Sequence, residues 1–230
     1  AWCRAIKDTL ATLTTDNRLL VWNIANIKQL TTVDISSGIP PALIDVGVKI
    51  VQLSSPALDL SFSDDGLELA TSGRDGVATI WKWASDQCHR RWSPYEGRPV
   101  KASIFITSPK DCPLLITGNE FNNEISLWDT SSNPPTLLQT VTLLEPSQEN
   151  ARLSAINNPI LQETQYPNVF FNHACIDSTS TFLVLINPVK KSGYLLHLNA
   201  SKAKGDWSNS SFDYITEFAF EGCVLSFSIS

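Results

Sequence analysis

A short pattern of strands and turns recurs along this chain and constrains its fold more than any other feature. The clearest copy runs from Ala57 to Trp81 and holds three segments separated by two turns. Apolar and polar residues alternate within each segment, which places one face of a strand against a core. The turns carry Asp65-Gly66 and Asp75-Gly76, pairs that suit the positive φ of a tight hairpin. The pattern therefore predicts three antiparallel strands joined by two hairpin turns.

Looser copies of the same pattern precede and follow this one. Three tryptophans stand near the end of the third segment of their copies, where a large indole can fill the wedge between neighbouring sheets. They are Trp22, Trp81 and Trp128. Repeats of this kind are typical of β-propellers, in which each repeat supplies one blade. The sequence therefore predicts an all-β, WD-repeat β-propeller.

The length of the repeat sets the expected division of the chain. A blade with its connections uses about 40–45 residues, so 230 residues hold about four to five blades. We expect a half blade at residues 1–24, blades at 25–83, 84–130 and 131–198, and closing strands at 199–230, among them Ile215–Phe218 and Val224–Phe227. A propeller removes its open sheet edges only by closing its ring. The chain is therefore predicted to be the later part of a larger, seven-bladed ring.

Part of the polar network of WD repeats is present in the clearest copy. In such repeats a turn Asp orients a His, the His bonds a Ser or Thr, and this hydroxyl bonds the indole of the Trp. Asp75 and Ser72 match two of these positions, beside Trp81. The stretch expected to hold the His, Gln52–Pro56, contains none. Because buried polar groups need partners, we assign Ser72 and Asp75 structural roles in a divergent repeat held chiefly by its core.

Motifs for catalysis are missing from the sequence. It has no Gly-rich phosphate loop after a strand, no Gly-x-Ser-x-Gly elbow and no His-Glu-x-x-His. His173 and Cys175 could share a strand face, but no second pair follows at zinc spacing. The apolar runs are also too short to cross a bilayer. We expect no catalytic residues, no cofactor, no metal site and no membrane insertion.

The densest basic stretch raises the question of nucleic-acid binding. It runs from His89 to Trp92, is followed by Arg98 and Lys101, and interleaves cations with aromatic rings, a composition that can bind phosphates and bases. The whole chain carries a net charge of −6, however, and electrostatic binding needs positive charge gathered in one patch. We favour a solvated outer strand and keep direct RNA binding through Arg90, Arg91 and Lys101 as an alternative.

Protein binding is the better-supported role of a propeller surface. The turn between the second and third strands and the link between blades emerge on the same face. Arg74, Tyr95, Arg98 and Phe121 would meet there, and aromatic and Arg side chains dominate protein interfaces. Phe121 lies in the otherwise polar stretch Asn119–Asn123. These four residues are our candidates for partner contact.

Several segments, in this order along the chain, resemble the propeller of the Varicose/Hedls-type scaffold family, the enhancer of mRNA decapping. They are Trp2-Cys3, Asp16–Trp22, Val33–Ser36, Leu60–Trp81, Trp92–Pro94, Gly97–Pro99, Leu115–Trp128 and Ile215–Phe227. The chain departs from the family where Tyr95 replaces a His and Glu120 replaces a turn Asp. The resemblance implies a non-catalytic scaffold that joins the decapping activator and decapping enzyme subunits in cytoplasmic processing bodies.

Two other classes of function remain open on the sequence. An unrelated WD-repeat adaptor, acting in ubiquitin ligation, trafficking or chromatin, would carry the same repeats. A propeller hydrolase or lactonase would need a central metal or a cluster of carboxylates.

Overall fold

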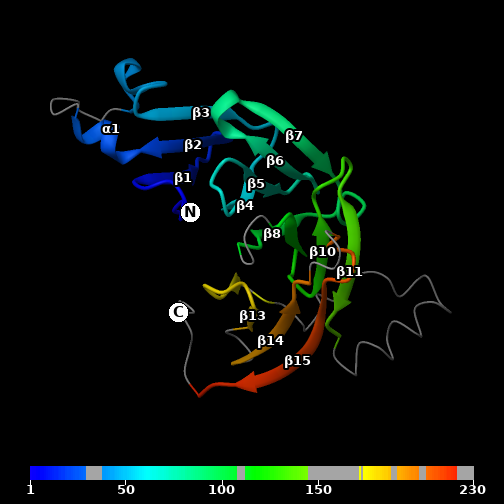
Figure 1. Cartoon of the computed structure of the whole chain (residues 1–230). Helices are drawn as coiled ribbons and strands as arrows, with labels where there is room; N and C mark the ends of the chain where they lie inside the picture. Colours follow the sequence, from blue (N-terminus) through cyan, green and yellow to red (C-terminus); the bar gives the residue numbers. More distant parts are fainter. Residues whose placement is uncertain are drawn as a thin grey trace, which may run out of the picture.

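Four antiparallel sheets make up the fold in the computed structural model of the chain. The structure describes residues 1–29, 38–107, 112–144, 171, 173–187, 191–201 and 206–221. The sheets follow one another around an open arc, and consecutive sheets face each other (Figure 1). This arrangement confirms the predicted all-β propeller architecture for the part of the ring that the chain forms.

Each of the second, third and fourth sheets has four strands, which follow chain order from the inside of the arc to the outside. The first sheet comprises β1 (Thr9–Leu13), β2 (Arg18–Asn23) and β3 (Val48–Gln52). The second comprises β4 (Ala57–Phe62), β5 (Leu69–Gly73), β6 (Ala78–Lys82) and β7 (Gln87–Trp92). The third comprises β8 (Val100–Phe105), β9 (Leu114–Asn119), β10 (Glu124–Asp129) and β11 (Thr136–Thr142). The fourth comprises β12 (His173–Ile176), β13 (Phe182–Asn187), β14 (Ser192–Asn199) and β15 (Ser211–Ala219).

Short helical segments lie outside these sheets. They are α1 (Ile24–Gln29), the 3-10 turn η1 (Pro41–Leu43) and the 3-10 turn η2 (Trp83–Ser85). The side chains of Ile27 and Leu43, from α1 and η1, pack with Leu20, Trp22 and Val48 of the first sheet. Among the described residues, no helix is long and apolar enough to cross a membrane.

The core consists of apolar layers between consecutive sheets. Alternation along β5 puts Leu69 against the first sheet and Ala70 against the third. The layer between the third and fourth sheets is the largest, and Ile116, Leu127, Leu183 and Leu196 in it are fully buried. Successive residues of β5 thus face two different layers, and all five residues of the strand are buried.

Glycine is required at two of the predicted turns. Gly66 and Gly76 adopt φ values of 73° and 74°, where only glycine is free of strain. A Cβ atom on Gly76 would also lie 2.4 Å from the carbonyl carbon of Gly97, in the link between β7 and β8. The β5–β6 turn and this link therefore meet backbone to backbone.

The sheets are offset by one strand from the predicted units. Units 25–83 and 84–130 begin with β3 and β7, which pair with β2 and β6 of the preceding sheets. Likewise β11, inside unit 131–198, pairs with β10. The predicted boundaries differ because the outer strands β7 and β11 bury few side chains and so lack the apolar runs that mark strands such as β5 and β9.

The expected closing strands need a similar correction. Ile215–Phe218 belongs to β15, which pairs with β14 as the fourth strand of the fourth sheet rather than starting another blade. Val224–Phe227 and most of the connection 134–168 lie outside the described residues. The total of seven blades and the place of this chain in the ring stay predictions.

Candidate protein-interaction face

Each of the three repeated tryptophans donates its indole N–H to a threonine on the neighbouring strand. The Nε1–Oγ1 distances are 2.9 Å for Trp22–Thr12, Trp81–Thr71 and Trp128–Thr117. Trp81 and Trp128 lie in the layers between sheets, as expected, whereas Trp22 lies on the outward side of the first sheet, against α1 and η1. The repeated element of the polar network is therefore a Trp–Thr pair.

Ser72 does not take the predicted part in this network. Alternation along β5 places Ser72 on the face of Ala70, away from Trp81, and Thr71 accepts the indole hydrogen bond. The Ser72 hydroxyl is buried, and no hydrogen-bond partner lies near it among the described residues. The sequence left a choice between two adjacent hydroxyls, and only the register of the strands decides it.

Asp75 organises the β5–β6 turn without a histidine. Its Oδ1 accepts a hydrogen bond from the backbone N–H of Val77 at 3.3 Å, and its Oδ2 lies 3.6 Å from the guanidinium of Arg91. The carboxylate thus fixes the turn and pairs with a cation from β7.

Tyr95 is buried, which contradicts its predicted role as a partner contact. Its side chain is only 2% exposed. The hydroxyl lies 2.8 Å from the carbonyl oxygen of Thr117, 3.1 Å from the hydroxyl of Thr117 and 3.1 Å from the carbonyl oxygen of Glu124. Burial raises the pKa of Tyr95 to about 12. Tyr95 therefore supplies, beside Thr117 and Trp128, the polar group that a His supplies in the family pattern.

The other three candidate residues lie along one edge of the arc. Arg98, with 56% of its side chain exposed, bonds Glu124 at 2.9 Å and lies 5.7 Å from the centre of the Tyr95 ring. Arg74 is exposed in the β5–β6 turn, which touches the β7–β8 link through the hydrogen bond from Ser93 Oγ to the Gly76 carbonyl. Phe121 is half-buried in the β9–β10 turn. The β5–β6 turn (74–77), the β7–β8 link (93–99) and the β9–β10 turn (120–123) thus lie along one edge, which we call the rim.

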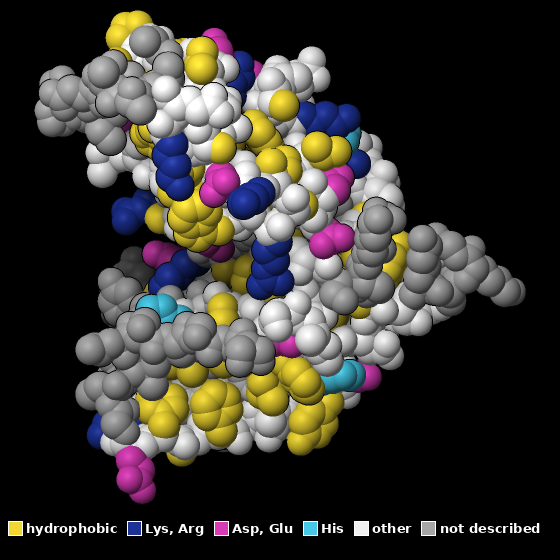
Figure 2. All heavy atoms as spheres, turned by 60° about the vertical axis from the view of Figure 1, so that its left-hand side comes forward, with side chains coloured by type: hydrophobic (Ala, Val, Ile, Leu, Met, Phe, Trp, Pro, Cys, Tyr) yellow, Lys and Arg dark blue, Asp and Glu magenta, His cyan; other side chains and the backbone are white. Residues whose placement is uncertain are grey.

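The basic stretch is largely paired with carboxylates. Arg90 Nη1 lies 3.3 Å from Glu68, and His89 Nδ1 lies 2.5 Å from the same carboxylate. Arg91 and Arg98 face Asp75 and Glu124, as described above. Burial lowers the pKa of Lys101, while the nearby Glu120 acts in the opposite direction. On the face seen in Figure 2, basic and acidic side chains are interspersed rather than gathered into one basic patch.

A half-buried carboxylate on an inner strand was not among the residues predicted from the sequence. Asp59 of β4 accepts a hydrogen bond from the backbone N–H of Ser103 in β8 at 2.9 Å. Two residues on, the hydroxyl of Ser61 accepts from the N–H of Phe105 at 3.0 Å. Burial raises the pKa of Asp59 to about 6, against the lowering effect of the hydrogen bonds that its carboxylate accepts from the backbone N–H groups of Ser103 and Leu60. The two side chains join consecutive sheets on the inside of the arc. No local sequence motif predicts this role.

A metal centre has no support in the described part of the chain. No group of three or more His, Cys, Asp or Glu side chains there is placed to hold a metal ion.

Comparison with solved structures places this architecture among propellers. One match is a chain of the mitotic checkpoint complex, at 15% identity and a TM-score of 0.57, covering 96% of this chain and 52% of the other. Another is the β-propeller domain of Myceliophteria_thermophila Cps50 (Swd1), at 13% identity and a TM-score of 0.53, covering 83% and 48%. Identities this low show the fold alone.

Curated relatives give a more specific likeness. The enhancer of mRNA-decapping protein 4 homolog of Drosophila melanogaster is 23% identical over 100% of this chain, and enhancer of mRNA-decapping protein 4 of Xenopus laevis is 26% identical over 97%. The chain spans only 18% and 16% of the length of these two relatives. Protein Rae1 of Drosophila melanogaster is 31% identical over 40% of this chain.

The family model for the WD40 region of Ge1, an enhancer of mRNA-decapping protein, matches residues 4–203. This match spans most of the described strands, including all three Trp–Thr pairs. The chain therefore belongs to the Ge1 WD40 family of mRNA-decapping enhancers.

Proposed function

We propose that this propeller is a non-catalytic scaffold that supports assembly of the mRNA-decapping complex. Its partners would be the decapping activator and decapping enzyme subunits, and it would act in cytoplasmic mRNA decay, in processing bodies. The match of residues 4–203 to the decapping-enhancer family carries this proposal.

The rim is the part of the surface best suited to contact a partner. Arg98 presents an exposed guanidinium whose position is fixed by Glu124 and by the Tyr95 ring beneath it. Interfaces draw much of their affinity from a few Arg and aromatic side chains held in place in this way. Arg74, Arg98 and Phe121 are therefore the proposed contacts, and Tyr95 is a support for them.

Binding of purified decapping activator and decapping enzyme subunits to the chain tests the proposal. We expect the double substitution Arg98→Ala with Phe121→Ala to weaken binding of at least one of them by tenfold or more, on the order of a hot-spot loss. The matched control is Lys82→Ala with Leu67→Ala, which removes an exposed cation and an apolar side chain (59% exposed) at the opposite ends of the strands.

Three outcomes would count against parts of this proposal. Unchanged affinity for every subunit in the rim variant would remove the proposed contacts. Recovery of ligase or coat subunits from cells without any decapping factor would favour the unrelated adaptor. RNA binding that weakens steeply with salt would support direct RNA contact, which the pairing of Arg90 and Arg91 with carboxylates disfavours.

A further inference from the structure

The second blade carries a polar slot at the position that Tyr95 fills in the third blade. Strand registers align the two: Trp81 and Thr71 correspond to Trp128 and Thr117, and Thr79 corresponds to Ser126. In the third blade the Tyr95 hydroxyl reaches into this position from the β7–β8 link. In the second blade the corresponding link, residues 53–56, is shorter and provides no aromatic side chain.

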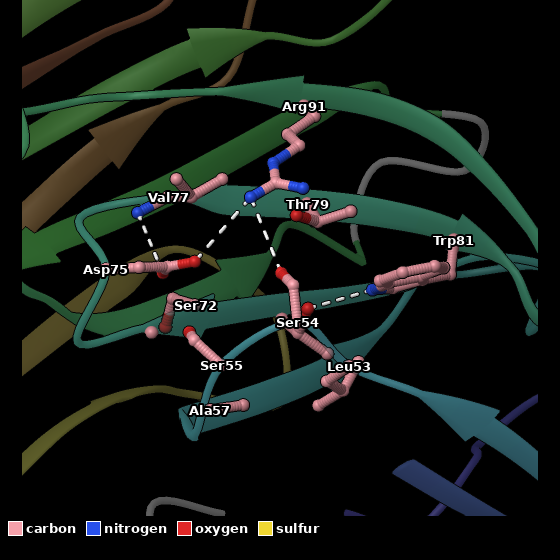
Figure 3. A pocket seen from close by; sticks show the side chains of 12 residues that line it. Leu53, Ser54, Ser55, Ala57, Ser72, Asp75, Val77, Thr79, Trp81 and Arg91 are labelled. Atoms are coloured by element: carbon pink, nitrogen blue, oxygen red, sulfur yellow. Dashed lines mark hydrogen bonds and ion pairs between the residues drawn. The ribbon is translucent and has the colours of Figure 1, made fainter. Parts of the chain in front are cut away.

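The slot has a polar lining and a small volume of about 30 Å³. Figure 3 shows the side chains of Ser54, Ser55, Asp75, Thr79 and Arg91 around one space beside Trp81. Thr71 also lines the slot. A water-sized group needs roughly 10–15 Å³ measured in this way, so the slot has room for about two such groups. It therefore suits the head of one small polar side chain rather than a ring.

The mouth of the slot is open to solvent. Ser54 is exposed, and the Arg91 side chain is 52% exposed. The inner end is closed by Thr71 and Thr79, which are both buried. A side chain approaching along the rim would therefore enter by displacing the exposed Arg91 side chain from Ser54, 3.5 Å away.

The charges of the slot restrict what it can accept. Asp75 and Arg91 lie 3.6 Å apart and offer one acceptor and one donor of opposite charge, and Ser54 already accepts weakly from Arg91 at 3.5 Å. Arg91 would repel a cationic ligand, and Asp75 would repel an anionic one. A neutral group that both donates and accepts can satisfy both, together with the hydroxyl of Thr79.

We propose that this slot binds the carboxamide of an Asn or Gln side chain presented by a protein partner lying along the rim. The amide N–H₂ would donate toward Asp75, and the amide oxygen would accept from Arg91 or Thr79. A carboxamide has two polar atoms, which matches both the volume and the charge pattern of the slot. This inference rests on the proposed scaffold function and adds the chemistry by which one blade recognises a partner.

Acetamide is a suitable probe because it is a bare carboxamide. In NMR titrations of the chain, we expect saturable shifts of the Val77 amide, which bonds Asp75, and of the Trp81 indole N–H. The dissociation constant should be on the order of 10–100 mM for a ligand of this size. Thr79→Val keeps the shape of the slot but loses one hydrogen bond, and should weaken binding about fivefold. Ser55→Tyr should close the slot as Tyr95 does in the third blade, and abolish the shifts.

Ser126→Ala is the matched control, since it removes the hydroxyl that corresponds to Thr79 from the position already filled by Tyr95; acetamide binding should be unchanged. Equal binding by Ser55→Tyr, binding of acetate as tight as that of acetamide, or no saturable shift at all would overturn the proposal. The last result would mean that the slot holds water only. None of these outcomes depends on decapping factors, so failure here is distinguishable from failure of the scaffold proposal.

Discussion

At the scale of single residues, threonine hydroxyl groups accept hydrogen bonds from the indoles of the three repeated tryptophans. The same 2.9 Å hydrogen bond from a Trp indole to a Thr hydroxyl recurs in three blades. The link that precedes the blade and packs beside this bond differs between the second and third blades. Tyr95 supports it in the third blade, and the second blade has only small polar side chains at that place. The Trp–Thr pair is therefore the constant part of the network, and the link residue is the variable part.

Removal of each of the two adjacent hydroxyls in β5, one at a time, tests this assignment. Thr71→Val leaves the Trp81 indole N–H without its acceptor, and we expect it to lower the free energy of unfolding by about 1–3 kcal/mol. Ser72→Ala removes a hydroxyl that has no partner in the described structure, and should change stability by less than about 0.5 kcal/mol. Urea denaturation of the chain measures both. A larger loss for Ser72→Ala would restore Ser72 as the network residue.

Tyr95→Phe isolates the contribution of one phenol hydroxyl. Because this hydroxyl lies within hydrogen-bond distance of Thr117 and Glu124, its loss removes a buried hydrogen bond and should destabilise the chain by about 1–3 kcal/mol. Tyr214→Phe is the same chemical change at a side chain that is 58% exposed, and it should be nearly neutral. Comparable melting temperatures of the two variants would contradict the buried role.

At the scale of strands, the inner strands β4 and β8 of consecutive sheets are joined by side chains rather than by a ladder of backbone hydrogen bonds. Asp59 and Ser61 of β4 accept backbone N–H groups of β8. Because the folded state raises the pKa of Asp59 from 3.8 to about 6, it favours the protonated carboxyl group. The contribution of the Asp59 carboxyl group to the stability of the fold is therefore fully present below about pH 4, and it is lost as the pH rises to about 6.

Asp59→Asn should remove this dependence on pH. The amide oxygen can still accept from Ser103, so we expect the variant to be more stable than the parent chain above pH 6, by about 1–3 kcal/mol. The difference between the two should shrink steadily as the pH falls toward 4. Urea midpoints at several pH values provide the measurement, with Asp86→Asn in the exposed η2 region as the control. A difference that stays constant from pH 4 to pH 7 would exclude titration of Asp59.

The inner strands were predictable from the sequence, and the outer ones much less so. Leu69 and Ile80 lie on strands whose two faces both contact a core, so burial restricts these strands to a recognisable run of apolar and small residues. Strand β7 contains Gln87 and Cys88 among mostly exposed or half-buried side chains, so burial leaves little pattern there. Tyr95 was misjudged for a related reason. An aromatic with a polar tip between Pro94 and Gly97 suits a binding surface and a buried network equally well.

At the scale of the whole molecule, stability should come mainly from the apolar layers between sheets. Leu127 is fully buried between the third and fourth sheets. We expect Leu127→Ala to cost about 2–5 kcal/mol, since it removes buried methyl groups and leaves a cavity. Leu137→Ala, in the outer strand β11 at 49% exposure, should cost less than about 0.5 kcal/mol. Similar urea midpoints for the two would mean that this layer contributes little.

The offset between the sequence repeats and the sheets also determines where the chain can be divided without breaking a sheet. A chain cut after Trp83 or Thr130, where the predicted units end, would strip β6 or β10 of the outer strand that covers its hydrogen-bonding edge. Cuts in the links at 53–56 or 93–99 keep every sheet entire. Blade exchanges designed on the links should therefore keep every strand edge covered, whereas those designed on the repeats expose an edge that invites aggregation.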